Sequence, residues 1–274
     1  MAVEPVKSRN AWSGRVKAGV ALCAFTGVAF AIGFVIYFGL DQVGDAFLAA
    51  GWQGLAAMTL AYLASVVLCA CAWHTLLLTP VKNSFAVFNW ARLLRDSAGN
   101  ILAVVPGAGE AIAARELTFF GLRSGPAAAS TVVDVTMEIV SQLFFTLIGL
   151  AILAWEKPGE PLALWSLAGV AITAVAMVGF IAAQRGGLFH MLQSLPDRLG
   201  LTAPWDASDQ SQSIHAGIEA IYREPRRAVC SVLVHLIAWT VGACEAWLVL
   251  SFMGHPLGLS EVLVIESLIF AIRS

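Results

Sequence analysis

Charged residues are scarce in this sequence: Asp, Glu, Lys and Arg together make up 12% of its 274 residues. Soluble domains carry about 25%. Because 59% of the residues are hydrophobic, the composition alone indicates a membrane protein. The net charge of -2 provides no polybasic surface, so we expect no nucleic-acid partner.

Disulfide, metal and nucleotide signatures are also missing. The five cysteines all lie in apolar runs, where a thiol behaves as a small hydrophobic group. Cys69 and Cys71 are two residues apart and no His follows at zinc-ligand spacing, so we expect no metal site. Gly107-Ala-Gly109 lacks the third glycine of a dinucleotide motif, and neither a Walker lysine nor a Gly-x-Ser-x-Gly sequence is present. We expect no cofactor.

Long apolar runs dominate the chain instead. A helix that crosses a bilayer needs roughly 20 mostly apolar residues, at a rise of about 1.5 Å each. Four segments have this length and composition, namely residues 18–40, 55–78, 127–154 and 162–183. A fifth, 228–253, also carries His235 and Glu245. The predicted fold is an all-α polytopic membrane bundle with about five full spans.

Basic residues predict the orientation, because Lys and Arg accumulate in short cytoplasmic loops. They gather in the tail 1–17 and in the connections 79–126 and 184–227, whereas Lys157 alone lies in a predicted outer connection. The N-terminus is therefore predicted to be cytoplasmic. We expect a cytoplasmic tail, 1–17, followed by a single membrane domain, 18–274.

Two further segments fall short of a span. The polar stretch 208–227 predicts a solvated connector or a short interfacial helix, on which Glu219 and Arg223, four residues apart, would pair. The apolar stretch 261–272 is about half a span long. It indicates either a half-inserted sixth segment or a chain truncated at the C-terminus, and we favour truncation.

The segment 85–122, between the second and third spans, is too polar to span and too apolar for an ordinary loop. Residues 85–96 predict an interfacial amphipathic helix. Its apolar face would hold Val87, Trp90, Ala91 and Leu94, and its polar face Asn89, Arg92 and Asp96.

The apolar run 101–114 is broken near its middle by Pro106 and Gly107. Broken helices at membrane depth are tolerated only inside protein or along a watery cavity, and transporters use them to face a charged substrate group. We favour a re-entrant element here. The alternative is two short surface helices joined by a Pro-Gly turn.

Glu110 and Arg115 follow this break and are five residues apart. On a helix their side chains would point about 140° apart, so each is expected to find a partner on another helix.

The third span carries an acidic face, because Asp134, Glu138 and Gln142 follow one another at intervals of four. Ionisable groups facing lipid cost about 2.5 kcal/mol or more each, so this face should point into the bundle. Nearby cations would neutralise it. The candidates are Arg92, Arg95 and Arg115. A helix-packing salt bridge and a direct role in substrate handling both stay open.

In the fifth span, His235 and Trp239 share a face and Glu245 points elsewhere. An intramembrane His acts either as a hydrogen-bonded packing residue or as a proton carrier, and an intramembrane Glu is the stronger functional candidate.

The pattern of Asn100, Pro106, Gly109-Glu110 and Arg115, followed by a polar-faced span, resembles the flippase-like membrane domain of lysylphosphatidylglycerol synthetases and their stand-alone relatives. Residues 130–149 look most like the members associated with hopanoid biosynthesis. In many relatives the Arg lies nearer the Gly-Glu pair than Arg115 does, which weakens a one-to-one role for it.

The resemblance implies a protein of the bacterial inner membrane that moves a lipid between leaflets, without enzymatic activity of its own. It covers the flippase-like part alone. The residues we assign as candidates for substrate binding or translocation are Asn100, Pro106, Gly109, Glu110, Arg115, Asp134, Glu138, Gln142 and Glu245. Two alternatives stay open. One is a membrane enzyme with Glu110, Asp134 and Glu138 as acid/base residues, and the other is a non-catalytic scaffold for membrane partners in lipid biosynthesis.

Overall fold

The structure is a computed structural model that describes residues 25–30, 32–33, 36, 40–79, 81–102, 107–156 and 207–273, with single and paired residues between 168 and 182. The described residues form helices and connections, with no strand among them. The all-α prediction is therefore confirmed. The predicted spans at 18–40 and 162–183 lie largely outside the described residues, and so does Pro106.

Three described helices are long and apolar enough to cross a membrane. They are α2 (Leu40–Thr75, apolar from Leu48), α5 (Ser124–Glu156) and α9 (Pro225–Phe252). They correspond to the predicted second, third and fifth spans, which are confirmed. Gly51 in α2 has φ 60° and ψ -179°. These angles lie outside the helical region, so the helix changes direction there.

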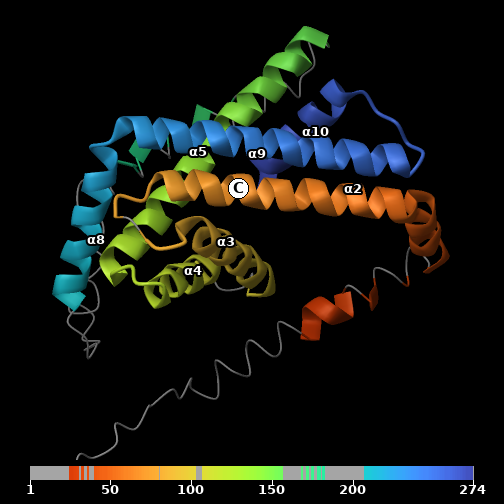
Figure 1. Ribbon diagram of the computed structural model, residues 1–274. Helices are drawn as coiled ribbons and strands as arrows, with labels where there is room; N and C mark the ends of the chain where they lie inside the picture. Colours follow the sequence, from red (N-terminus) through yellow and green to blue (C-terminus); the bar gives the residue numbers. More distant parts are fainter. Residues whose placement is uncertain are drawn as a thin grey trace, which may run out of the picture.

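Helices α2 and α9 lie side by side and antiparallel, and α5 crosses them obliquely (Figure 1). At one end, Arg227 Nη1 donates to the carbonyls of Thr75 (3.1 Å) and Leu77 (2.9 Å). This contact satisfies acceptors left open at the end of α2. Farther along, Ser65 Oγ donates to the Ala238 carbonyl at 3.3 Å. The start of α9 is thus fastened to the end of α2.

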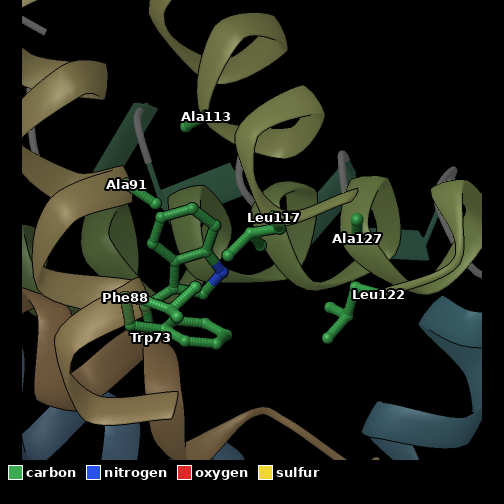
Figure 2. Packing of buried hydrophobic residues seen from close by; sticks show 8 residues of the cluster. Trp73, Phe88, Ala91, Ala113, Leu117, Leu122 and Ala127 are labelled. Carbon is green, nitrogen blue, oxygen red and sulfur yellow. The ribbon is translucent and has the colours of Figure 1, made fainter. Parts of the chain in front are cut away.

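Helices α3 (Ser84–Ile101) and α4 (Ala108–Phe119) form a pair beside α2 and α5 (Figure 1). Figure 2 shows the apolar core that joins them, in which the Trp73 and Phe88 rings meet edge to face with centroids 5.0 Å apart. The buried cluster comprises Trp73, Val87, Phe88, Ala91, Ala113, Leu117, Leu122 and Ala127. This burial shows that the pair packs against α2 and α5, while the choice between a re-entrant element and two surface helices stays a prediction.

The orientation of α3 corrects one prediction. Val87 and Ala91 are buried as expected, but Arg92 and Arg95 are buried as well, and Trp90 is 50% exposed. The predicted division into faces is wrong for two residues, because Trp90 of the apolar face is exposed and Arg92 of the polar face is buried. Carboxylates on α5 neutralise the two guanidinium groups inside the bundle. A largely apolar side chain such as Trp90 can be exposed to lipid at little cost in free energy.

Close backbone contact holds α4 against α3. A Cβ on Gly109 would lie 2.5 Å from the Arg95 carbonyl oxygen and 3.1 Å from the Gly99 nitrogen. Only glycine fits at such a distance, and small residues at helix contacts are typical of membrane bundles. Just before it, Gly107 begins α4 with φ 78°, a conformation that glycine adopts readily.

Two more helices pack against α5. Helix α8 (Ala207–Tyr222) packs on α5 and buries Ile218, so the stretch 208–227 contains a packed helix. The predicted pair of Glu219 and Arg223 is confirmed at 3.2 Å. Helix α10 (Leu259–Arg273) has 15 residues, in agreement with a segment shorter than a span. Gln142 Nε2 on α5 donates to the Phe270 carbonyl on α10 at 2.8 Å.

Candidate functional site

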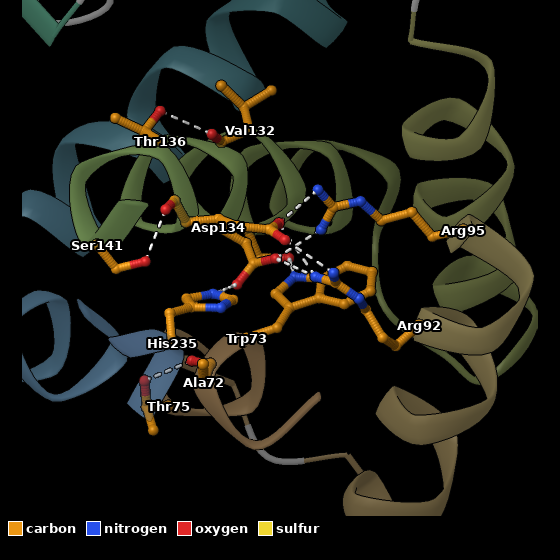
Figure 3. A network of polar contacts seen from close by, with 12 residues as sticks. Ala72, Trp73, Thr75, Arg92, Arg95, Val132, Asp134, Thr136, Ser141 and His235 are labelled. Carbon is orange, nitrogen blue, oxygen red and sulfur yellow. Dashed lines mark hydrogen bonds and ion pairs between the residues drawn. The ribbon is translucent and has the colours of Figure 1, made fainter. Parts of the chain in front are cut away.

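Two arginines of α3, Arg92 and Arg95, lie at the centre of a buried set of charged groups (Figure 3). Each is 7% exposed. Their spacing of three residues places them on one side of α3. They face Asp134 and Glu138 on α5, of which Asp134 is fully buried. We call Arg92, Arg95, Asp134, Glu138 and His235 the ion network.

Each arginine makes several charge-assisted bonds. Arg92 Nη1 and Nη2 donate to the two carboxylate oxygens of Glu138 at 3.1 and 2.8 Å, a bidentate geometry that favours strong pairing. Arg95 Nη1 donates to Asp134 Oδ2 at 2.8 Å, and its Nη2 donates to Glu138 Oε2 at 2.9 Å. The prediction that α5 points its acidic face inward, toward Arg92 and Arg95, is confirmed.

His235 connects α9 to the ion network. Its Nε2 lies 3.1 Å from Asp134 Oδ1, and both side chains are fully buried. Because a carboxylate accepts, the imidazole donates its Nε2–H in this contact. Asp134 is therefore held on one oxygen by α3 and on the other by α9. In this contact, His235 acts as a hydrogen-bonded packing residue.

Two further carboxylates flank the ion network. Arg92 Nε donates to Asp96 Oδ2 at 3.0 Å, and Arg95 Nε donates to Glu110 Oε1 at 3.4 Å. Burial raises the pKa of the Asp96 carboxyl, and Arg92 only partly offsets this effect. The Glu110 side chain is 39% exposed, so it is the most accessible carboxylate of this group. Two guanidinium groups face four carboxylates, so these six groups carry a formal sum of -2 before His235 is counted.

A cavity of about 500 Å³ opens beside the ion network, between α2, α3, α4, α5 and α9. Arg92, Arg95, Asp96, Glu110 and Glu138 line it on the charged side. Uncharged polar groups from Tyr62, Ser65, Asn100 and Gln142 also face it. The bundle thus forms a partly open cavity that has charged and polar groups beside apolar ones, while much of its outer surface is apolar.

Glu245 belongs to a second cavity, of about 320 Å³, which Glu266 of α10 also lines. Ser65 and Trp239 line both cavities. Trp239 Nε1 donates to Ser141 Oγ on α5 at 2.9 Å, and its ring lies 4.6 Å from that of Phe270. Glu245 and Trp239 thus line the same second cavity, whereas His235 does not line it.

A family model described as "Lysylphosphatidylglycerol synthase TM region" matches residues 24–273. The chain belongs to this family. No curated protein and no solved structure matches the chain. The family and the apolar helices together establish an integral membrane protein with a function related to membrane lipids.

In this member of the family, the described candidates other than Arg115 fall into four groups. Glu110, Asp134 and Glu138 meet at Arg92 and Arg95. Asn100 and Gln142 line the same cavity, whereas Glu245 lines the second. Gly109 serves the packing of α4 on α3.

Arg115 does not join the site. It is exposed on α4, and its guanidinium lies 5.8 Å from the ring centroid of Phe119 on the same helix. Within the described residues it forms no ion pair, so the expected cross-helix partner is found for Glu110 but not for Arg115. The long interval from Gly109-Glu110 to Arg115 already weakened a shared role.

Sequence reasoning did not assign Cys69, Asp96 or His235 to the site. Cys69 and Asp96 line the cavity, and His235 binds Asp134. A His in an apolar span was a signal for His235. Its partner lies 101 residues away, and helix periodicity says nothing about which spans touch.

Proposed function

We propose that this protein moves a lipid between the two leaflets, with the lipid head group passing through the 500 Å³ cavity beside the ion network. The observation that supports this proposal is a partly open cavity with a cluster of charged and polar groups along one side, in a bundle whose outer surface is largely apolar. A head group crossing the hydrocarbon core loses its hydration, and buried polar groups that replace water lower that penalty. Exposed apolar side chains such as Leu60, Val67 and Ile237 offer a surface for the acyl chains.

Within the cavity, Glu110 is the carboxylate best placed to meet a head group. Asp134 and Glu138 are held by Arg92 and Arg95. Glu110 has a single long contact of 3.4 Å to Arg95 and a part-exposed side chain. Its position in the first turn of α4 suits a carboxylate, because the helix dipole is positive there.

The test is lipid movement in reconstituted vesicles. Purified wild-type protein, Glu110→Gln and the matched control Glu116→Gln are placed in vesicles that contain a fluorescent lipid with an amine-bearing head group, which a carboxylate can bind, and quenching from outside reports flipping. Glu116 lies on the same helix but binds Trp90 and does not line the cavity. We expect Glu110→Gln to be slower by about tenfold, equivalent to about 1.4 kcal/mol on the barrier, and Glu116→Gln to match the wild type.

Two results would contradict the proposal. Wild-type vesicles that flip no faster than empty ones would exclude translocation, and an unchanged rate in folded Glu110→Gln would remove Glu110 from the path. A lipid product of altered mass would instead support the enzyme alternative. The resemblance of residues 130–149 to hopanoid-associated members supports a hopanoid as one lipid to test. If a hopanoid is a substrate, adding it unlabelled should slow the flipping of the labelled lipid by competition.

A further inference from the structure

Three side chains with metal-binding atoms converge beside the cavity, and each comes from a different span. They are Cys69 of α2, Glu138 of α5 and His235 of α9. The thiol sulfur, a carboxylate oxygen and a ring nitrogen all lie within 4.8 Å of one another. Cys69 is 8% exposed and His235 is fully buried.

The orientation of His235 supports a ligand at this point. Its Nε2 is taken by Asp134, whereas its other nitrogen, Nδ1, is buried and has no hydrogen bond of standard geometry within the described part of the chain, the Cys69 thiol being a polar neighbour of the ring. Buried polar atoms are nearly always paired. A carboxylate that holds one ring N–H leaves the lone pair of the other nitrogen available, which is the usual arrangement around a metal-binding His.

Glu138 also has capacity left for a metal ion. A carboxylate offers about four lone-pair sites, and the arginines occupy three of them, two from Arg92 and one from Arg95. The two guanidinium groups also fix the position of the carboxylate. One acceptor site therefore remains on Glu138.

The local charge tolerates a divalent ion. The ion network and its flanking carboxylates Asp96 and Glu110 sum to -2 when His235 is neutral. A divalent ion bound with a thiolate adds +1, so the sum becomes -1. Metal binding thus reduces the imbalance of buried charge instead of enlarging it.

The ligand types select the class of ion. Thiolate and imidazole suit zinc and related transition metals, whereas magnesium and calcium prefer oxygen ligands throughout. Ligand atoms around tetrahedral zinc lie roughly 3.3–3.8 Å apart, given bond lengths of about 2.0–2.3 Å. The three ligand atoms now lie within 4.8 Å of one another. Small side-chain rotations would bring their separations into that range.

We propose that Cys69, Glu138 and His235 bind a transition-metal ion of the zinc class, with Asp134 positioning the imidazole. Cys69 and Glu138 line the 500 Å³ cavity, so the fourth coordination position opens toward it. Three protein ligands and one open position are typical of zinc sites that bind a further oxygen ligand. The site stands independently of lipid movement.

The experiment measures metal binding by the full chain, purified in detergent and freed of any affinity tag. Co²⁺ alone is the first probe, because a thiolate bound to Co²⁺ gives a charge-transfer absorption band. Cys69→Ser is compared with Cys71→Ser, its neighbour on the same helix. We expect the band in the wild type and in Cys71→Ser and its loss in Cys69→Ser, with Zn²⁺ affinity lower by at least about tenfold.

Absence of the band in folded wild-type protein would overturn the proposal. An equal band in Cys69→Ser would also overturn it, because the metal would then bind elsewhere. Size-exclusion profiles and tryptophan fluorescence establish that each variant is folded. If Cys69→Ser fails to fold, His235→Asn serves as the second variant, because it removes the ring nitrogen. A band of unchanged strength in His235→Asn would then overturn the proposed site.

Discussion

Replacing Arg95 with Met removes the guanidinium that Glu110, Asp134 and Glu138 share. Methionine keeps most of the buried volume, so the main effect is electrostatic. Asp134 is fully buried and would keep one hydrogen bond, to His235. Removing one partner of a buried ion pair costs about 3–5 kcal/mol. Because Arg92 Nη1 lies 3.9 Å from Asp134 Oδ2 and compensates in part, we expect about 3 kcal/mol.

The assay is reversible unfolding in mixed detergent micelles, followed by tryptophan fluorescence. The control is Arg223→Gln, which breaks an exposed pair with Glu219 and should change the free energy of unfolding by about 0.5 kcal/mol or less. Arg95→Met combined with Asp134→Asn should be less destabilised than the sum of the two single changes, by about 1–3 kcal/mol. An Arg95→Met protein as stable as the Arg223→Gln control would refute the argument that the ion network holds the bundle.

Two further predictions concern the same helix pair. Gly109→Ala places a methyl group 2.5 Å from the Arg95 carbonyl oxygen and should lower the free energy of unfolding by about 1–3 kcal/mol, whereas Gly44→Ala, with nothing within 4 Å, should not lower it. Burial raises the pKa of Asp96, so the folded state binds the proton more tightly and wild-type stability should fall as pH rises through that raised pKa. Asp96→Asn should lose this dependence and be no less stable at neutral pH. The measurement is the unfolding midpoint of each protein at a series of pH values. A wild-type midpoint that rises with pH through this range would contradict the prediction.

The spans could be predicted because lipid imposes a simple rule of length and composition. α5 and α9 begin and end within a few residues of the predicted bounds. The inward direction of Asp134 and Glu138 followed from the same physics, since unpaired charge is costly against lipid. Each of these inferences uses residues within a single helix.

Which face of α3 points into the bundle could not be predicted in the same way. An amphipathic pattern gives two faces, and whether the charged face lies in or out depends on what the neighbouring helix offers. Here Glu138 on α5 receives Arg92 and Arg95. The contact of His235 with Asp134 depends in turn on how α9 sits against α5. Such pairings belong to the tertiary arrangement, which periodicity does not encode.

The inward-facing arginines also set an order for assembly in the membrane. α3 leaves the ribosome before α5, and α5 leaves it before α9. Until Asp134 and Glu138 are in place, Arg92 and Arg95 have no buried counter-charge, and their insertion into hydrocarbon is unfavourable. The α3–α4 pair therefore waits at the water-facing side and docks only after α5 has crossed. In a chain truncated before residue 134, cysteines introduced along α3 and α4 should therefore be open to modification by water-soluble thiol reagents.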